Sequence, residues 1–158
     1  MTKTPGSDDV DMIEFLGAAM DVRRIIAHLL EPVARNHGLS ERTLSIVVLA
    51  HAGLNRPSLL VDYLGVLPST ISSDVDKLAG LGLLRRTPSA TDRRATTLEV
   101  TPAGVALQQR VLGDLRAHFD SKVAAVSTDE LRACITTLHK ISGGPHPDLP
   151  DELCNPSA

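Results

Sequence analysis

The residues with the clearest chemical potential are hydroxyl and guanidinium side chains in the middle of the chain. Hydroxyl residues crowd positions 69–73 and a lysine follows one helical turn later: Ser69, Thr70, Ser72, Ser73 and Lys77. Residues 85–94 then hold four arginines and one aspartate, a local charge of +3. Hydroxyls both donate and accept hydrogen bonds and guanidinium forks bind phosphate, so this chemistry suits a polyanionic partner.

A helix, a tight turn and a second helix are the elements that must position these hydroxyls. Arg56-Pro57 predicts the start of a short helix, because proline is tolerated at the first helical position, and Gly65 can end that helix in the left-handed conformation. Pro68 predicts the start of the second helix and Leu81-Gly82 its end. The hydroxyls lie opposite an apolar face whose members recur at helical spacing, namely Ile71, Val75 and Leu78.

The residue period changes from helical to two after the second helix. Residues 83–87 predict one short strand and residues 96–100 a second, in which Leu98 and Val100 face the same side. Residues 88–94, between them, have the composition of a loop, so the strands can pair as a hairpin with a long basic tip. The order helix, turn, helix, strand, basic loop, strand predicts a winged helix-turn-helix.

This pattern resembles the MarR family of transcriptional regulators over roughly residues 10–142. The motifs stand in the family's order and spacing: Pro68-Ser69-Thr70-Ile71-Ser72, Leu78, Gly82-Leu83, Arg85-Arg86, Asp92-Arg93-Arg94 and Leu98-Glu99-Val100-Thr101-Pro102-Ala103-Gly104. The resemblance implies a mainly α fold with a small β-hairpin wing, in which a winged helix-turn-helix is flanked by N- and C-terminal dimerisation helices. It also implies a homodimeric, sequence-specific DNA-binding regulator, a repressor relieved by a small-molecule ligand.

Side chains of the two helices, of the strand that leads into the wing and of the wing tip are expected to contact double-stranded DNA. Hydroxyls in the first turns of the second helix can reach base edges or phosphates, and Lys77 suits a phosphate. The wing-tip arginines are expected to enter a minor groove or contact phosphate, as the family's D-x-R arginine usually does, with Asp92 bracing them. The expected DNA-contacting residues are Arg56, Ser58, Ser69, Thr70, Ser72, Ser73, Lys77, Arg86, Arg93 and Arg94.

Two departures from the family's usual pattern, together with nearby negative charge, predict modest affinity. Leu67 stands where the family often has a Ser or Thr cap, and Ser73 stands where it often has Arg. Asp74 and Asp76 are expected to add negative charge near the groove. A good bidentate base contact is worth about 1–3 kcal/mol, so the chain is expected to read its site mainly through hydroxyls, water and DNA shape.

Amphipathic helices flank the winged module on both sides. Pro32 should end or kink the first helix, and Ser40 is a good N-cap for the next. After the hairpin, Pro102 starts a long helix, and Ser127–Glu130 forms a capping box for the last one. A winged module cannot bury both outer apolar stripes by itself. These stripes are therefore expected to pack together and against a second copy, which favours a palindrome-like DNA site.

Composition indicates one compact domain with tails. The 158 residues are 42% hydrophobic, and the net charge of −3 divides into +1 for residues 54–101 and −2 for each flank. The predicted parts are a flexible tail at 1–11, N-terminal dimerisation and support helices at 12–53, a DNA-binding lobe at 54–101, C-terminal dimerisation helices at 102–142 and a disordered tail at 143–158. No signal peptide or membrane-length apolar run is found, so a cytoplasmic location is expected.

No enzyme, metal or cofactor site is expected. No nucleophile–base pair, glycine-rich phosphate loop or metal-ligand spacing stands out, and the two cysteines form no paired motif. Cys134 is expected to be a buried small hydrophobe, with a redox sensor as the alternative. The resemblance implies a small ligand between the dimer helices and the DNA-binding lobe. Its candidate residues are Arg24, His28, His51 and His118, with core or surface roles as the alternative.

Simpler interpretations of the same residues stay open. The hydroxyl run also fits an ordinary solvated helix face, the arginines fit an exposed hairpin, and Asp92 fits a turn residue. The negative total charge, with Asp74 and Asp76, also allows a winged-helix protein-interaction module without specific DNA binding. A gel shift with the DNA upstream of the gene would separate the two functions.

Overall fold

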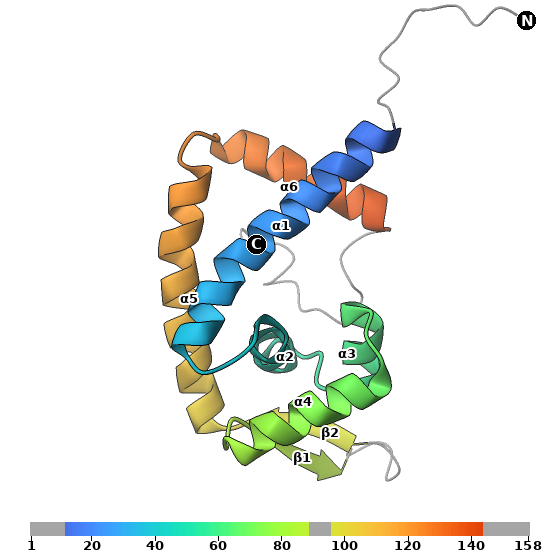
Figure 1. Ribbon diagram of the computed structural model, residues 1–158, viewed down its shortest axis with the longest axis vertical. Coiled ribbons are helices and arrows are strands. Elements are labelled where there is room, and N and C mark those ends of the chain that lie inside the picture. Colours follow the sequence, from blue (N-terminus) through green and yellow to red (C-terminus); the bar gives the residue numbers. More distant parts are fainter. Residues whose placement is uncertain (1–11, 89–95, 144–158) are drawn as a thin grey trace, which may run out of the picture.

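Helices and one β-hairpin make up the described part of the chain. The computed structural model describes residues 12–88 and 96–143, so the predicted tails, apart from Gly143, and the wing-tip residues Asp92, Arg93 and Arg94 lie outside it. The elements in chain order are α1 (Met12–Asn36), α2 (Glu41–His51), α3 (Pro57–Leu64), α4 (Pro68–Gly80), β1 (Leu84–Pro88), β2 (Thr96–Val100), α5 (Pro102–Val123) and α6 (Thr128–Ser142). The predicted mainly α fold with a small hairpin is confirmed (Figure 1).

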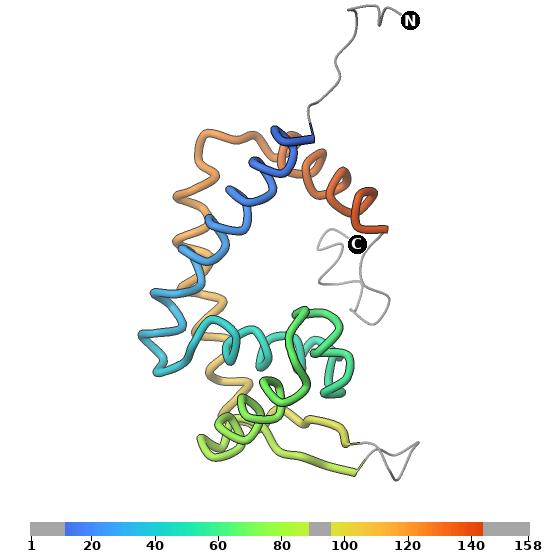
Figure 2. Tube along the Cα trace, turned by 45° about the vertical axis from the view of Figure 1, so that its right-hand side comes forward, coloured from blue at the N-terminus to red at the C-terminus, as the bar shows by residue number. Residues whose placement is uncertain are grey.

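The hydrophobic core lies in the lobe formed by α2, α3, α4 and the hairpin. Its fully buried side chains come from every one of these elements: Leu44, Ile46, Val47, Leu60, Ile71, Val75, Leu78, Leu84 and Leu98. α5 leaves this lobe beside the hairpin, runs alongside α1 and carries the chain to α6 at the other end (Figure 2). Leu107 and Val111 of α5 and Val33 of α1 attach the long helices to the core.

Local signals in the sequence fix the helix ends as predicted. Ser40 caps α2, Thr101 caps α5, and Ser127 forms a reciprocal capping box with Glu130 at the start of α6. These side chains satisfy backbone N–H groups that the first helical turn leaves without partners. Gly65 ends α3 at φ 62°, a left-handed conformation that costs glycine little because it lacks a Cβ.

Two boundary predictions need correction. Pro32 was expected to end or kink α1, and because α1 continues through it to Asn36, an end at Pro32 is wrong. Val33 and Ala34, directly after the proline, are each only 1% exposed, and their burial stabilises the last turn despite the lost backbone hydrogen bond. The first strand begins at Leu84 rather than residue 83, with Leu84 opposite Val100 and Arg86 opposite Leu98.

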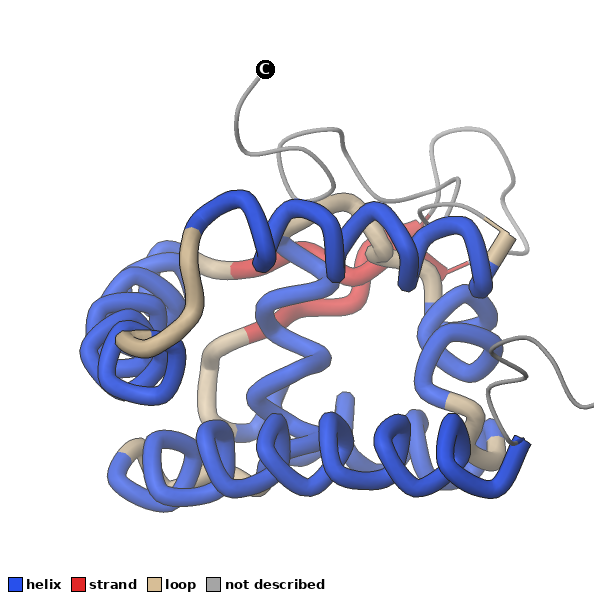
Figure 3. The backbone as a smooth tube through the Cα atoms, turned by 90° about the horizontal axis from the view of Figure 1, so that it is seen from above, coloured by secondary structure: helices blue, strands red, loops and turns tan. Residues whose placement is uncertain are grey.

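The outer helices do not complete their packing within one chain. α1 and α6 cross in the projection of Figure 1, but the view from above in Figure 3 shows them apart. α6 buries none of its residues, although its apolar stripe includes Ile135, Leu138 and Ile141. Cys134 is also exposed, which corrects the expectation of a buried thiol within the single chain. Across the described helices, the predicted packing of the two outer stripes on each other is therefore not found within the single chain.

Candidate nucleic-acid interface

α4 separates its apolar and polar residues onto two faces, as the sequence predicted. Ile71, Val75 and Leu78 are fully buried and fix the helix against the core. The polar residues on the other face are exposed, apart from a half-buried Thr70: Ser69, Ser72, Ser73, Asp76 and Lys77. α4 therefore presents short hydrogen-bonding side chains outward on a rigidly packed element, beside the hairpin (Figure 1).

The start of α4 has no side-chain cap. Leu67 occupies the N-cap position, is 70% exposed, and accepts a hydrogen bond from the Thr70 backbone N–H at 3.0 Å. Pro68 follows at the first helical position, where its missing N–H is not needed. The N-terminal turn of α4 therefore carries the positive end of the helix dipole without a capping hydroxyl or carboxylate of its own.

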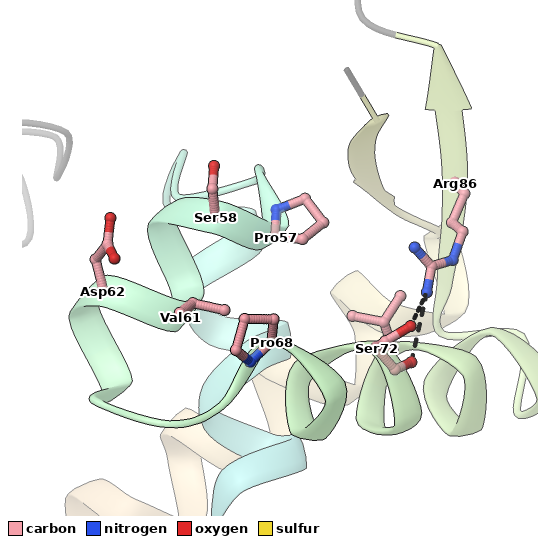
Figure 4. Close-up of a pocket in the computed structure, with 8 residues that line it drawn as sticks. Pro57, Ser58, Val61, Asp62, Pro68, Ser72 and Arg86 are labelled. Carbon is pink, nitrogen blue, oxygen red and sulfur yellow. Dashed lines mark hydrogen bonds between the residues drawn. The ribbon is translucent and has the colours of Figure 1, made fainter. Parts of the chain in front are cut away.

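Arg86 on β1 reaches back to α4. One of its terminal nitrogens donates to Asp76 Oδ1 at 2.9 Å, with longer contacts to the Ser72 carbonyl at 3.4 Å and hydroxyl at 3.5 Å. Figure 4 shows the Arg86 side chain extended over Ser72, beside a hollow that α3 and α4 line with Pro57, Val61 and Pro68. Arg86, which was expected to contact DNA, is thus paired with a carboxylate of α4.

Arg85, the neighbouring arginine, is paired across the hairpin. Its guanidinium donates to both carboxylate oxygens of Glu99, with N–O distances of 2.8 Å and 2.5 Å. These hydrogen bonds lower the pKa of the Glu99 carboxyl and raise the pKa of Arg85. The pair stabilises the register of β1 on β2 and neutralises one of the four arginines in residues 85–94.

Asp74 does not face the same side as Asp76. It is 9% exposed and accepts hydrogen bonds from Arg42, in the first turn of α2, through both carboxylate oxygens. The hydrogen bond to Asp74 is the main cause that raises the pKa of Arg42. The expectation that Asp74 adds negative charge near the groove is therefore wrong. Its position three residues after Ile71 already places it near the buried face, and this spacing could have revealed it.

Arg56 and Ser58 lie at the start of α3, and both are exposed. Arg56 is the N-cap residue and Ser58 lies in the first turn. A small hollow brings them close to Pro57, Arg86 and Thr96, so residues from α3, β1 and β2 share one surface with the start of α4. The structure thus brings together the described members of the predicted set, and Arg93 and Arg94 fall outside the described residues.

The four candidate ligand residues lie on three helices: Arg24 and His28 on α1, His51 on α2 and His118 on α5. Arg24 pairs with Asp21 at 2.6 Å, and the His118 Nδ1 lies 2.8 Å from the Asp114 carbonyl. His28 and His51 are exposed. An apolar pocket between α1 and α5 includes none of the four and is lined by Ile26, Leu29, Leu30, Leu112, Leu115, Arg116 and Phe119.

Within residues 12–88 and 96–143, no three His, Cys, Asp or Glu side chains are grouped closely enough to hold a metal ion. In the same ranges, no helix combines the length and apolar character that crossing a membrane requires.

Comparisons with known proteins agree with this geometry. Residues 48–104 match the model of the winged helix DNA-binding domain family. The HTH-type transcriptional regulator PecS of Dickeya dadantii is 33% identical over 139 residues, covering 84% of each protein. Among solved structures, CouR of Rhodococcus jostii RHA1 bound to p-coumaroyl-CoA has a TM-score of 0.73 at 24% identity, covering 89% of this chain and 99% of that one.

A structure solved with DNA shows the same fold. A cysteine-to-serine mutant of Escherichia coli MarR, in complex with operator DNA, has a TM-score of 0.67 at 20% identity, covering 85% of this chain and 99% of that one. At this identity the likeness concerns the fold, whereas the likeness to PecS concerns the sequence over most of both chains. Helix order, hairpin and sequence relationship thus agree, and this chain belongs to the MarR family of DNA-binding transcriptional regulators.

Proposed function

We propose that this chain is a homodimeric, sequence-specific DNA-binding regulator that represses transcription until a small-molecule ligand is bound. The observation that carries the proposal is the two-faced α4. Its apolar side is fully buried, while Ser69, Ser72 and Ser73 face outward beside the hairpin. A helix held in this way presents hydrogen-bonding groups to a major groove without rearranging.

The proposed DNA contacts divide by the element that carries them. Ser69, Thr70, Ser72 and Ser73 of α4 reach base edges or phosphates, and Lys77 neutralises a phosphate. Arg56 and Ser58 at the start of α3, together with Arg86 on β1, serve the flanking backbone. Arg93 and Arg94, braced by Asp92, act at the wing tip outside the described residues.

Exposed apolar side chains support a homodimer as the active form. The outer helices expose large hydrophobic side chains: Met12, Ile13, Leu16, Met20, Ile25 and Ile26 on α1, and Ile135, Leu138 and Ile141 on α6. Apolar surface on this scale favours burial against another protein surface, and a second copy offers the same stripes in a two-fold arrangement. Such a dimer places two α4 helices about 34 Å apart, one turn of B-DNA, on a palindrome-like site.

Ligand control is supported by two observations. The related fold of CouR binds p-coumaroyl-CoA, and this chain has its own apolar pocket between α1 and α5. α1 and α5 belong to the dimerisation part, and α5 continues directly from the hairpin at Thr101. A ligand between them can favour a dimer whose two α4 helices are wrongly spaced for DNA.

The central test is discrimination between DNA sequences. Genomic fragments captured by the purified protein would be sequenced, and the recovered site and a scrambled duplex of equal length titrated by fluorescence anisotropy. We expect the site to bind about 1000-fold or more tightly than the scrambled duplex at physiological salt. Equal affinity for both duplexes would contradict sequence-specific regulation. Ligand control is tested by release of the site from the dimer across a panel of aromatic acids and their thioesters.

A protein-interaction module without specific DNA binding is the second candidate. It is favoured by the carboxylate partners of Arg85 and Arg86, which reduce the positive charge available to phosphates. The titrations above separate the two candidates, because an interaction module would bind neither duplex tightly.

A further inference from the structure

The ion pair between Arg86 and Asp76 affects how much positive charge remains available to DNA on the surface that α4 and β1 share. Asp76 lies on the exposed face of α4, two residues from the buried Asp74 and next to Lys77. Arg86 comes from β1, ten residues along the chain, and its guanidinium meets Asp76 at 2.9 Å. The Asp76 side chain is 68% exposed and that of Arg86 is 37% exposed. The contact is therefore a surface pair that water and DNA can both reach.

The other charges around this face show what the pair does. Asp74 is neutralised by Arg42 beneath the helix, and Arg85 is neutralised by Glu99 across the hairpin. On the exposed face of α4, Asp76, Lys77 and Arg86 together carry a charge of +1, and the ion pair of Asp76 is with Arg86. Arg86 is drawn onto α4 by Asp76 and by its longer contacts to Ser72.

We propose that Asp76 restrains Arg86 on α4 and so limits sequence-independent binding to DNA. This inference rests on the proposed DNA-binding function and adds to it a role for a carboxylate. Sequence-independent affinity comes from neutralising phosphates, and each cation that reaches a phosphate releases counterions. A cation already paired with a carboxylate on its own protein contributes less to that release. The hydroxyls of α4 are uncharged, so they add nothing to the salt dependence of binding, and that of Ser72 lies 3.5 Å from Arg86.

The opposite role for Asp76 would be to brace Arg86 for a DNA contact. The geometry favours restraint, because the nitrogen that meets Asp76 also points to the backbone carbonyl of Ser72, toward the helix itself. The pair is open to solvent on the Asp76 side, so it is a modest restraint, and its loss should change affinity by several-fold and not by orders of magnitude. Once the carboxylate is removed, Arg86 is available to a phosphate.

The experiment compares Asp76→Asn with the wild type on a scrambled duplex over a salt series. The substitution keeps the size of the side chain and removes its charge. We expect several-fold tighter binding to scrambled DNA, with a salt slope steeper by about 0.9, the value for one additional phosphate contact. The affinity for the recovered site should rise by a similar factor, because the added phosphate contact does not depend on the DNA sequence.

The same substitution in a protein that lacks Arg86 tests whether the effect depends on the Arg86–Asp76 pair. In Arg86→Gln, the further change Asp76→Asn should leave the salt slope unaltered, because no arginine remains to be released. Asp120→Asn is the matched control: Asp120 is an exposed carboxylate on α5, 3.8 Å from Arg116, and its loss changes the net charge equally. We expect this control to leave the salt slope at the wild-type value.

Each outcome has one meaning. Weaker binding by Asp76→Asn, or an unchanged salt slope while the wild type binds DNA normally, would overturn the restraint and leave the proposed function standing. Failure of the wild type itself to bind any duplex would instead contradict the proposed function. Thermal melting confirms that each variant is folded before titration, and Asp76→Ser provides a second charge-removing variant.

Discussion

Single residues around α4 show that two similar carboxylates have unlike surroundings. Asp74 and Asp76 are two positions apart, and both are paired with arginines. Sequence alone treated both as negative charge facing the groove. Helical spacing places Asp74 toward the core side, but its partner Arg42 lies 32 residues away and carries no local signal. Side-chain pairing between distant elements was therefore the part of the site that pattern and composition could not reveal.

The different burial of the two carboxylates predicts different effects on stability. Asp74→Asn should lower the free energy of unfolding by about 1–3 kcal/mol, because the hydrogen-bonded charge partner of Arg42 is lost in a buried setting. Asp76→Asn should change it by less than about 1 kcal/mol, as expected for an exposed pair. Urea unfolding of both variants, at one protein concentration, measures the difference. Equal effects would mean that the Arg42–Asp74 contact adds nothing beyond a surface pair.

The Arg85–Glu99 pair predicts a pH dependence for the hairpin. Its hydrogen bonds hold the pKa of Glu99 below the ordinary value of about 4.5. A carboxyl whose folded-state pKa is lowered stabilises the fold above its unfolded pKa, and this contribution is lost as pH falls through the folded-state pKa. Glu99→Gln should therefore melt below the wild type at pH 7, and the gap should close only as pH falls through the lowered folded-state pKa of Glu99. A gap that persists at low pH would assign the effect to the amide and not to the charge.

At the scale of elements, repeating apolar positions and capping residues were sufficient to predict most of the fold. α4 and β2 follow from period and turn signals, and α5 and α6 follow from Thr101 and Ser127. An end of α1 at Pro32 was wrongly expected because helix propensity is local, whereas the burial of Val33 and Ala34 is a property of the folded lobe. Local sequence preference therefore predicts the start of a helix or strand more reliably than its end, because the end also depends on tertiary packing.

The junction between the hairpin and α5 predicts an effect of a single methyl group. A Cβ at Gly104 would lie 2.3 Å from the Leu83 carbonyl oxygen, so backbone would have to move. Gly104→Ala should destabilise by about 1–3 kcal/mol, the usual cost of overpacking. Gly113→Ala is the control in the same helix, since nothing lies within 4 Å of its Cβ, and alanine there should stabilise by about 1 kcal/mol. Thermal melting of the two variants measures both effects. A Gly104→Ala variant more stable than the wild type would show that the backbone at this junction moves at little cost.

The whole molecule combines a well-buried lobe with long helices that remain exposed. The lobe holds most of the fully buried side chains, whereas α6 buries none of its own. Sequence periodicity predicted the apolar stripes but not their separation in a single chain, because an amphipathic pattern does not say which surface will cover it. The proposed second copy would cover the exposed stripes and would give the two-fold spacing of an operator.

This arrangement predicts that α6 controls DNA affinity without touching DNA. Leu138→Glu places a charge in the exposed apolar stripe, so it should convert the dimer to monomer while the winged lobe stays folded. Site affinity should then fall by far more than affinity for a scrambled duplex, because a monomer reads only one half-site. Thr136→Glu, on the opposite side of the same exposed helix, is the control and should remain dimeric. Light scattering measures the molecular mass of each variant, and fluorescence anisotropy measures its affinity for DNA. A dimer that persists in Leu138→Glu, or a monomer with undiminished site affinity, would separate DNA recognition from dimerisation and contradict the two-fold proposal.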